Sequence, residues 1–182
     1  LGKALMLGGQ FGFISGSSFV VMGVLGVSPS VFGFCFGAVA LGIMTGTVLS
    51  SRFGAQLGLD RTIFCGTSLG AGAGVVLAAL AWSGILSVAA IVAPMYVFAI
   101  GLGLTLPNGT AGAIGPFPRM AGLAAAVASF LQMTGSALYS VAVARFDDGT
   151  ARPMTTAIAL AGVTALACFW RLRLRPRRGM LA

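Results

Sequence analysis

Uncharged, mostly apolar residues run along this chain in long blocks that are separated by a few charged positions. The charge-free intervals are 4–51, 62–118, 120–144 and 153–170. A helix needs about 20 residues to cross a bilayer, so the two longer intervals must each hold two crossings. Each of these two is interrupted near its middle by a turn-forming cluster, at 26–30 and at 82–84. The pattern therefore predicts six membrane helices, at about 4–26, 31–51, 62–82, 85–107, 120–144 and 153–171.

These helices predict an all-α integral membrane protein. Lipid offers backbone N–H and C=O groups no partner, and apolar runs such as 75–81 lack the alternation of a membrane β-strand. We expect a six-span membrane domain at 1–172 and a basic cytoplasmic tail at 173–182. The chain begins with Leu1 rather than Met, which indicates a processed chain or a fragment.

Composition excludes a water-soluble domain and most catalytic chemistry. Hydrophobic residues make up 58% of the chain and charged residues 8%, against roughly 25% charged in a typical globular protein. The chain has no His, so neither a His-based general base nor a His-ligated metal is available. The three cysteines, Cys35, Cys65 and Cys168, stand alone within apolar runs, which predicts neither a disulfide framework nor a metal site. Because no base is placed to activate the serines, we expect no enzyme activity and no cofactor.

The basic residues predict the topology. Six spans place both termini on one side, which then collects nine basic residues: Lys3, Arg52, Arg61, Arg119, Arg171, Arg173, Arg175, Arg177 and Arg178. The other side carries Arg145 and Arg152, with Asp147 and Asp148. Under the positive-inside rule both termini are cytoplasmic. The arginine-rich tail could instead bind anionic lipid or nucleic acid; we favour its role in topology and expect no nucleic-acid partner.

Glycine and proline predict how the helices pack. Of the 28 glycines, many recur at helical spacing and predict grooves for close helix contact: Gly8, Gly12 and Gly16; Gly33 and Gly37; Gly42 and Gly46; Gly66, Gly70 and Gly74. Pro94 falls inside the fourth predicted helix, where it would kink the helix, and Pro107 is expected to end it. Such features suit either a compact bundle or helices that rock during transport.

The polar side chains expected inside the membrane are neutral. No ionisable residue falls deep within a predicted span, so these spans offer no evident proton relay or ion-coupling site. Gln10 and Gln132 are the strongest candidates for a substrate pathway, because an amide has four hydrogen-bonding sites and is costly in hydrocarbon. A cavity of aromatic and amide side chains suits a small amphiphilic molecule. The remaining pathway candidates are Phe13, Ser17, Tyr96, Asn108 and Phe130. The alternative is that hydroxyls bond their own helices while aromatic rings face lipid.

The stretch from Pro107-Asn108 through Pro116-Phe117 and Gly122 to Gln132 resembles the Bcr/CflA drug-resistance transporters of the major facilitator superfamily. Residues 17–33 and 52–61 also look like stretches of that family. The resemblance implies the C-terminal six-span half of a twelve-span, proton-driven exporter in the bacterial inner membrane. The half would be built from two inverted three-helix repeats. The proton-coupling acids would lie in the missing N-terminal half, and small amphiphilic molecules, protons and membrane lipid would be its partners.

The resemblance also implies roles for single residues. Gly122 would let the fifth helix approach its neighbours. Pro107 and Pro116 would fix the turn between the fourth and fifth helices, and Asn108 would cap the helix end. In the loop that begins with Arg52-Phe53-Gly54, Asp60 and Arg61 would form a charge latch. Two other interpretations stay open: a self-sufficient six-span permease that pairs with a second copy, and a membrane scaffold that transports nothing.

Overall fold

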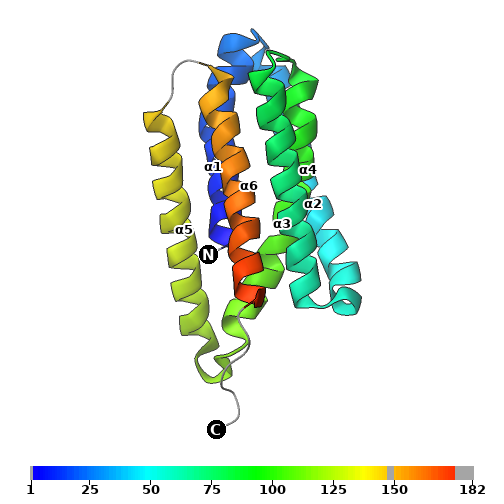
Figure 1. The fold of residues 1–182 in the computed structure, drawn as a ribbon, viewed down its shortest axis with the longest axis vertical. Coiled ribbons are helices and arrows are strands. Elements are labelled where there is room, and N and C mark those ends of the chain that lie inside the picture. The colour runs from blue at the N-terminus through cyan, green and yellow to red at the C-terminus, as the bar shows by residue number, and fades with distance from the viewer. Residues whose placement is uncertain (1, 147–149, 175–182) are drawn as a thin grey trace.

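The fold was established with a computed structural model, which describes residues 2–146 and 150–174. The described residues form six long helices and no strand (Figure 1). The helices are α1 (Gly2–Ser18), extended by the π-helical segment η1 (Phe19–Val24), α2 (Pro29–Leu57), α3 (Leu59–Trp82), α4 (Val88–Ile114), α5 (Ala121–Arg145) and α6 (Ala151–Leu174), with a short 3₁₀ turn η2 (Pro118–Met120) before α5. All six are long and apolar enough to cross a membrane, which confirms the predicted fold class. The chain is a multi-pass membrane protein.

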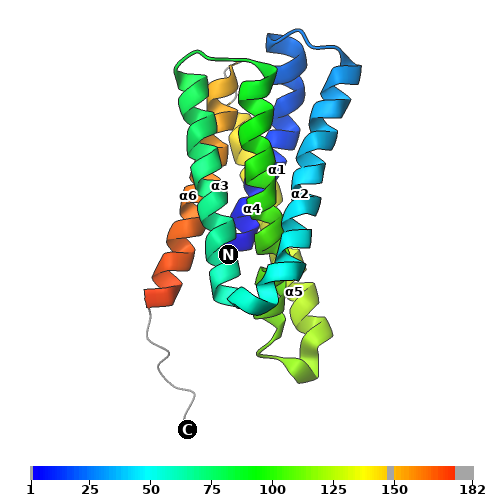
Figure 2. The same ribbon diagram turned by 90° about the vertical axis from the view of Figure 1, so that its right-hand side faces the viewer.

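Successive helices run in opposite directions (Figure 1), but apart from α3 with α4 the main packing is between helices that are not neighbours in sequence. α1 packs mainly against α5 and α6, while α4 packs mainly against α2 and α3. Figure 2 shows α4 between α2 and α3. α3 and α6 also pack against each other. The same pattern of pairs returns when α1, α2 and α3 are exchanged for α4, α5 and α6, in agreement with the two inverted three-helix repeats that the resemblance implied.

The turns lie near the predicted breaks, and three of them depend on glycine. Gly26, Gly58 and Gly84 adopt positive φ angles of 64°, 79° and 78°, a conformation that costs glycine little because it has no Cβ. Pro29 occupies the first turn of α2, where its missing N–H is not needed. Ser87 accepts a hydrogen bond from the Ala90 amide at 3.1 Å and so caps α4.

Two helices extend by more than one turn past their predicted ends. α2 continues from the predicted residue 51 to Leu57, and α4 continues from the predicted residue 107 to Ile114. Charges such as Arg52 were used to end the spans, but long cationic side chains can lie at a membrane surface while the helix continues. The tail predicted at 173–182 is helical as far as Leu174, and its remaining residues lie outside the described part of the chain.

Close packing at most of the glycine spacings is confirmed. A Cβ built on Gly42 would lie 2.7 Å from the Tyr96 carbonyl oxygen, and one on Gly74 would lie 2.9 Å from the Ala159 Cα. Side chains at these sites would push α2 from α4 and α3 from α6. The prediction is wrong for Gly33 and Gly37, where a Cβ would meet nothing within 4 Å among the described residues, because both lie on the exposed side of α2.

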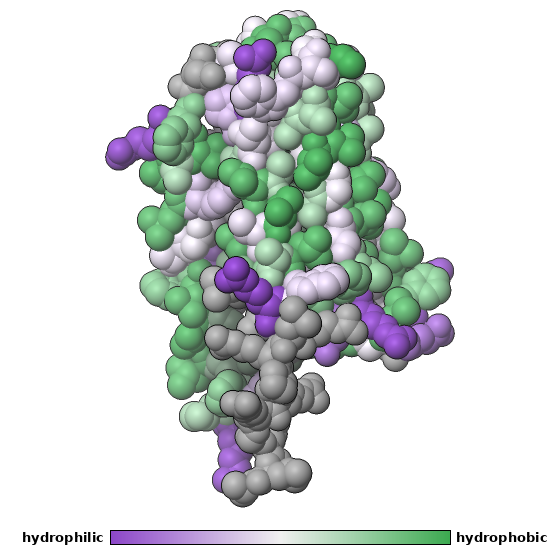
Figure 3. Space-filling view, in the orientation of Figure 1, coloured by the Kyte–Doolittle hydropathy of each residue, from purple (hydrophilic) through white to green (hydrophobic). Residues whose placement is uncertain are grey.

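The core lies where α1, α3, α4 and α6 meet, and it contains Met6, Phe13, Met95, Phe98 and Ile158. α2 and α5 are the least buried of the six helices. In Figure 3 hydrophobic residues cover the middle of the visible face, and hydrophilic residues gather at its lower end. We call this lower end, where α1 begins and α6 ends, the arginine-rich end, because Arg52, Arg61, Arg119 and Arg171 belong to it.

Candidate functional site

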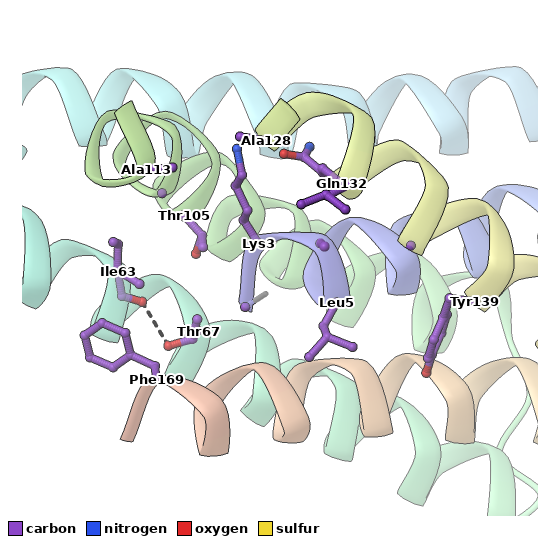
Figure 4. Close-up of a pocket in the computed structure, with 15 residues that line it drawn as sticks. Lys3, Leu5, Ile63, Thr67, Thr105, Ala113, Ala128, Gln132, Tyr139 and Phe169 are labelled. Atoms are coloured by element: carbon purple, nitrogen blue, oxygen red, sulfur yellow. Dashed lines mark hydrogen bonds between the residues drawn. The ribbon is translucent and has the colours of Figure 1, made fainter. Parts of the chain in front are cut away.

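A cavity of about 670 Å³ opens between α1, α3, α4, α5 and α6 at the arginine-rich end (Figure 4). This volume lies within the range of small-molecule sites. Its lining is mostly apolar, with Leu5, Ile63, Leu131 and Phe169 among the larger side chains. Its polar side chains are Lys3, Thr67, Thr105, Gln132 and Tyr139.

Lys3 is the charged residue of the cavity lining, and the sequence interpretation missed it. The first span was predicted to begin at residue 4, whereas α1 begins at Gly2 and carries Lys3 in its first turn. The Lys3 side chain packs against Gly109 of α4, and its Nζ donates a hydrogen bond to Thr110 Oγ1 at 3.0 Å. Within the part of the chain that the structure describes, none of the residues that line the cavity is acidic.

Most of the cavity's hydroxyl protons are already used within the protein. Thr67 donates to the carbonyl of Ile63 at 2.9 Å, and Thr105 donates to that of Gly101 at 2.7 Å. The Tyr139 hydroxyl donates to the Ala157 carbonyl of α6. These three side chains can therefore accept a further hydrogen bond but have no free proton to offer a ligand.

Gln132 is the predicted pathway residue that does reach the cavity. It lies on α5, and its side-chain amide has no hydrogen-bond partner among the described residues. In Figure 4 the Lys3 side chain extends from α1 so that its ammonium lies on the same side of the cavity as the Gln132 amide. Free donors therefore gather on one side of a mostly apolar cavity.

Gln10 and Ser17 lie in the core and do not line the cavity. Gln10 is 5% exposed and Ser17 is fully buried, and neither Gln10 Oε1 nor Ser17 Oγ has a hydrogen-bond partner in residues 2–146 and 150–174. Together with Lys3 they follow a seven-residue spacing, which puts all three on one side of α1. Unpartnered buried polar atoms are costly, so these two remain functional candidates.

The other predicted pathway residues are scattered. Phe13 belongs to the core, and Phe130 is 69% exposed on α5. The Tyr96 hydroxyl lies 3.3 Å from Thr45 Oγ1 and joins α4 to α2. Asn108 also joins these helices, because its Nδ2 donates to Ser50 Oγ at 2.6 Å and to the Leu104 carbonyl at 2.8 Å.

The structure corrects the expectations for Pro107 and Asn108. Neither marks the end of a helix, because α4 continues through both to Ile114. Proline has no N–H to offer the Gly103 carbonyl four residues earlier, but bilayer helices tolerate such a gap when neighbouring groups compensate. Pro94 is likewise inside α4, as predicted.

Of the remaining predicted positions, some lie where they were expected and others do not. Gly122 was expected at a close helix contact, but it is exposed and a Cβ there would meet nothing within 4 Å. Pro116 lies in the connection between α4 and η2, as expected. A Cβ on Gly54 would lie 3.8 Å from Asn108 Oδ1, an ordinary contact. Asp60 is in the first turn of α3 and is exposed, as is Arg61, so the charge latch stays a prediction.

Among the described residues, no three His, Cys, Asp or Glu side chains come together as a metal site would require. The arrangement offers a mostly apolar cavity with hydrogen-bond donors on one side. Its size and lining are suited to binding a small molecule.

Two similar curated proteins carry transporter names. Over 47 residues the chain is 45% identical to an uncharacterized MFS-type transporter of Bacillus subtilis, YdgK, an alignment that covers 26% of this chain and 12% of that protein. Over 94 residues it is 30% identical to Multidrug resistance protein D of Escherichia coli, with 52% of this chain and 24% of that protein covered. The chain is similar to MFS-type transporters.

The similarity is confined to part of each protein, and the matches span a quarter or less of either relative. No family model matches the chain, and no solved structure matches it.

Proposed function

We propose that this chain carries a small amphiphilic molecule across a bacterial inner membrane as the C-terminal six-helix half of a twelve-helix efflux transporter. The observation that carries the proposal is the cavity of about 670 Å³ inside a bundle of membrane-spanning helices, with apolar walls and donors gathered on one side. Amphiphilic ligands suit such a site, because their apolar part is removed from water while a few polar groups fix their orientation. The similarity to a protein named for multidrug resistance supports the same direction.

The proposal that a second half completes the transporter is supported by the outer helices. α2 and α5 are the least buried of the six, and their exposed large side chains include Phe34, Met44, Leu123 and Phe130. Part of this surface would face lipid, and part would face six further helices or a second copy of this chain.

Proton coupling in this proposal depends on acids outside the described spans. Asp60 lies at the start of α3, and the chain's other acids, Asp147 and Asp148, lie outside the described residues. We therefore assign the coupling carboxylates to the proposed N-terminal half, since acids that carry protons through membranes are placed inside spans.

The test is efflux of a fluorescent amphiphilic dye from cells that lack their own exporters and express the gene product that contains this chain. We expect faster dye efflux than in cells with an empty vector, and we expect Gln132→Leu to slow it several-fold at equal expression. Ser129→Leu on the exposed side of α5 is the matched control and should leave efflux unchanged. Equal efflux by the Gln132→Leu variant would remove the cavity from the pathway.

The intact mass of the native protein distinguishes a six-helix protein from a twelve-helix transporter of which this chain is one half. A mass near 18.3 kDa would leave the six-helix chain to act with a second copy of itself. A mass roughly twice that would place the proposed N-terminal half on the same polypeptide. Absence of efflux for every dye tested would favour a membrane scaffold instead.

A further inference from the structure

We propose that the cavity selects amphiphiles with a carboxylate head, which Lys3 neutralises and the Gln132 amide orients. The inference rests on the proposed function in one respect, since it names the substrate class of the same cavity. It goes further because it fixes the sign of the charge that the site accepts.

The charge balance of the cavity wall points to an anion. Lys3 contributes a positive charge, and none of the described residues that line the wall is acidic and able to neutralise it. The ammonium of Lys3 donates one hydrogen bond to the neutral Thr110 hydroxyl, which leaves the protons of Nζ only partly used. A cation next to a mostly apolar cavity is stabilised by an anion in the same cavity, because the low local dielectric strengthens their attraction.

The distribution of donors points to a carboxylate rather than to a neutral head. The hydroxyls of Thr67, Thr105 and Tyr139 already donate to backbone carbonyls, so they can only accept a hydrogen bond from a ligand. Lys3 and Gln132 are the side chains of the wall with protons left to donate. A carboxylate only accepts, so it matches two donors that lie on one side of the cavity.

The rest of the wall matches a hydrocarbon body. Leu5, Ile63 and Phe169 come from three different helices, and Figure 4 shows them on the side of the cavity away from the Gln132 amide. Burial of a hydrocarbon chain against them is favourable in proportion to the apolar area removed from water. The arginine-rich end adds a positive field around the cavity, which raises the local concentration of anions.

Binding to the purified full chain in lipid nanodiscs tests this inference directly. The probe is 11-(dansylamino)undecanoic acid, read by energy transfer from Trp170, which follows the cavity residue Phe169 on α6. Trp82→Phe in all variants leaves Trp170 as the single donor, since the chain has two tryptophans. We expect saturable binding of the acid and at least tenfold weaker binding of its methyl ester.

Lys3 variants assign the effect to this residue. We expect Lys3→Met to weaken binding of the acid at least tenfold without changing that of the ester, and Lys3→Arg to retain most of the affinity. Arg52→Met is the matched control, because it removes the same charge from an exposed position of the arginine-rich end outside the cavity wall. Acetate should not compete with the probe and dodecanoate should, which separates an amphiphile site from a simple anion site.

Three results would overturn the inference. These are equal affinity for acid and ester in the unaltered chain, equal affinity of Lys3→Met and Arg52→Met for the acid, or stronger binding of the matching dansyl alkylamine. The acid–ester comparison needs no mutation, so it decides the matter even if Lys3→Met does not fold.

The proposed function and the carboxylate preference are tested by different outcomes. Carboxylate binding without transport of any dye would keep the site and remove the transporter. Efflux of neutral or cationic dyes that does not depend on Lys3 would keep the transporter and remove the anion preference.

Discussion

Gln10 occupies the core of the bundle at a cost, because its amide oxygen is buried without a hydrogen-bond partner. An unsatisfied buried polar group destabilises a protein by about 1–3 kcal/mol. Gln10→Leu replaces the amide with an apolar side chain of similar size, so we expect the free energy of unfolding in detergent to rise by about 1 kcal/mol. If Gln10 is retained for transport, dye efflux should fall in the same variant.

Gln56→Leu is the control for this substitution, because Gln56 is exposed on α2 and its replacement removes no buried unpartnered atom. It should change neither the free energy of unfolding nor efflux. A Gln10→Leu protein that is less stable than the unaltered chain would mean that the amide has a partner in the membrane.

The hydrogen bond between Asn108 and Ser50 is expected to hold α4 against α2. Asn108 Nδ2 lies 2.6 Å from Ser50 Oγ, and Ser50 is 7% exposed. We expect a double-mutant cycle with Asn108→Ala and Ser50→Ala to give a coupling of about 0.5–1.5 kcal/mol in thermal or detergent unfolding. Ser51→Ala is the control, because its hydroxyl bonds only to Val48 of its own helix and is exposed. A coupling near zero would contradict the role assigned to this bond.

At the scale of residues, the sequence identified polar groups but not their neighbours. Gln10 and Ser17 could be singled out because uncharged polar residues within apolar runs are conspicuous, and both are buried. Lys3 is absent from the predicted pathway residues because a charge is taken as the edge of a span. Its packing against Gly109 depends on a helix 106 positions away in the sequence, which the local pattern does not reveal. The seven-residue spacing of Lys3, Gln10 and Ser17 was a signal that could have found it.

At the scale of elements, the contact of α2 with α4 depends on glycine. A Cβ on Gly103 would lie 2.9 Å from the Thr47 amide nitrogen and would also collide with the Ile43 carbonyl. We expect Gly103→Ala to lower the free energy of unfolding by about 1–3 kcal/mol, because backbone atoms cannot move aside as a flexible side chain can.

Gly37→Ala on the same α2 is the comparison. A Cβ there meets nothing within 4 Å, so the substitution should raise stability by up to about 1 kcal/mol through the lower chain entropy of alanine. The measurement is thermal unfolding of both variants in the same detergent. Equal effects of the two substitutions would contradict the α2–α4 contact.

Helix boundaries were the least predictable feature at this scale. The turns at Gly26 and Gly84 could be predicted because clusters of turn-forming residues interrupt the apolar pattern there. The predicted end of α4 is too early. Proline usually ends a helix because it removes a backbone hydrogen bond, and Pro107 was therefore expected to end this one. Inside a bundle, the Asn108 side chain donates to the Leu104 carbonyl, and the helix continues.

At the scale of the whole molecule, the alternation of six helices places the turns in two sets at opposite ends. The turn at Ser83 lies at the end opposite the connection that contains Met120. The excess of arginine at the second end predicts that it is cytoplasmic. In a variant without native cysteines, we expect Ser83→Cys to react with a membrane-impermeant maleimide in intact cells and Met120→Cys to react only after permeabilisation.

A cysteine at Ile85, in the same turn as Ser83, should follow Ser83 and serves as an internal control. Labelling of Met120→Cys in intact cells would reverse the predicted orientation. The number and order of the helices could be predicted from apolar length alone. Their arrangement in space could not, because glycine spacing marks a face that packs closely and does not name the helix that packs on it.

The interleaved packing of the two helix triplets has a consequence for synthesis of the chain. α1 has its main partners in α5 and α6, and α2 has its main partner in α4, so the first three helices touch one another little. After synthesis, α2 and α3 therefore lack a main partner in the bilayer until α4 has been made, and α1 lacks its main partners until α5 and α6 have been made. A fault in α5 or α6 would therefore leave α1 without its main partners and expose the protein to membrane quality control. Even two fragments cut at the 83–87 connection should rejoin, because each holds the surface that the other lacks.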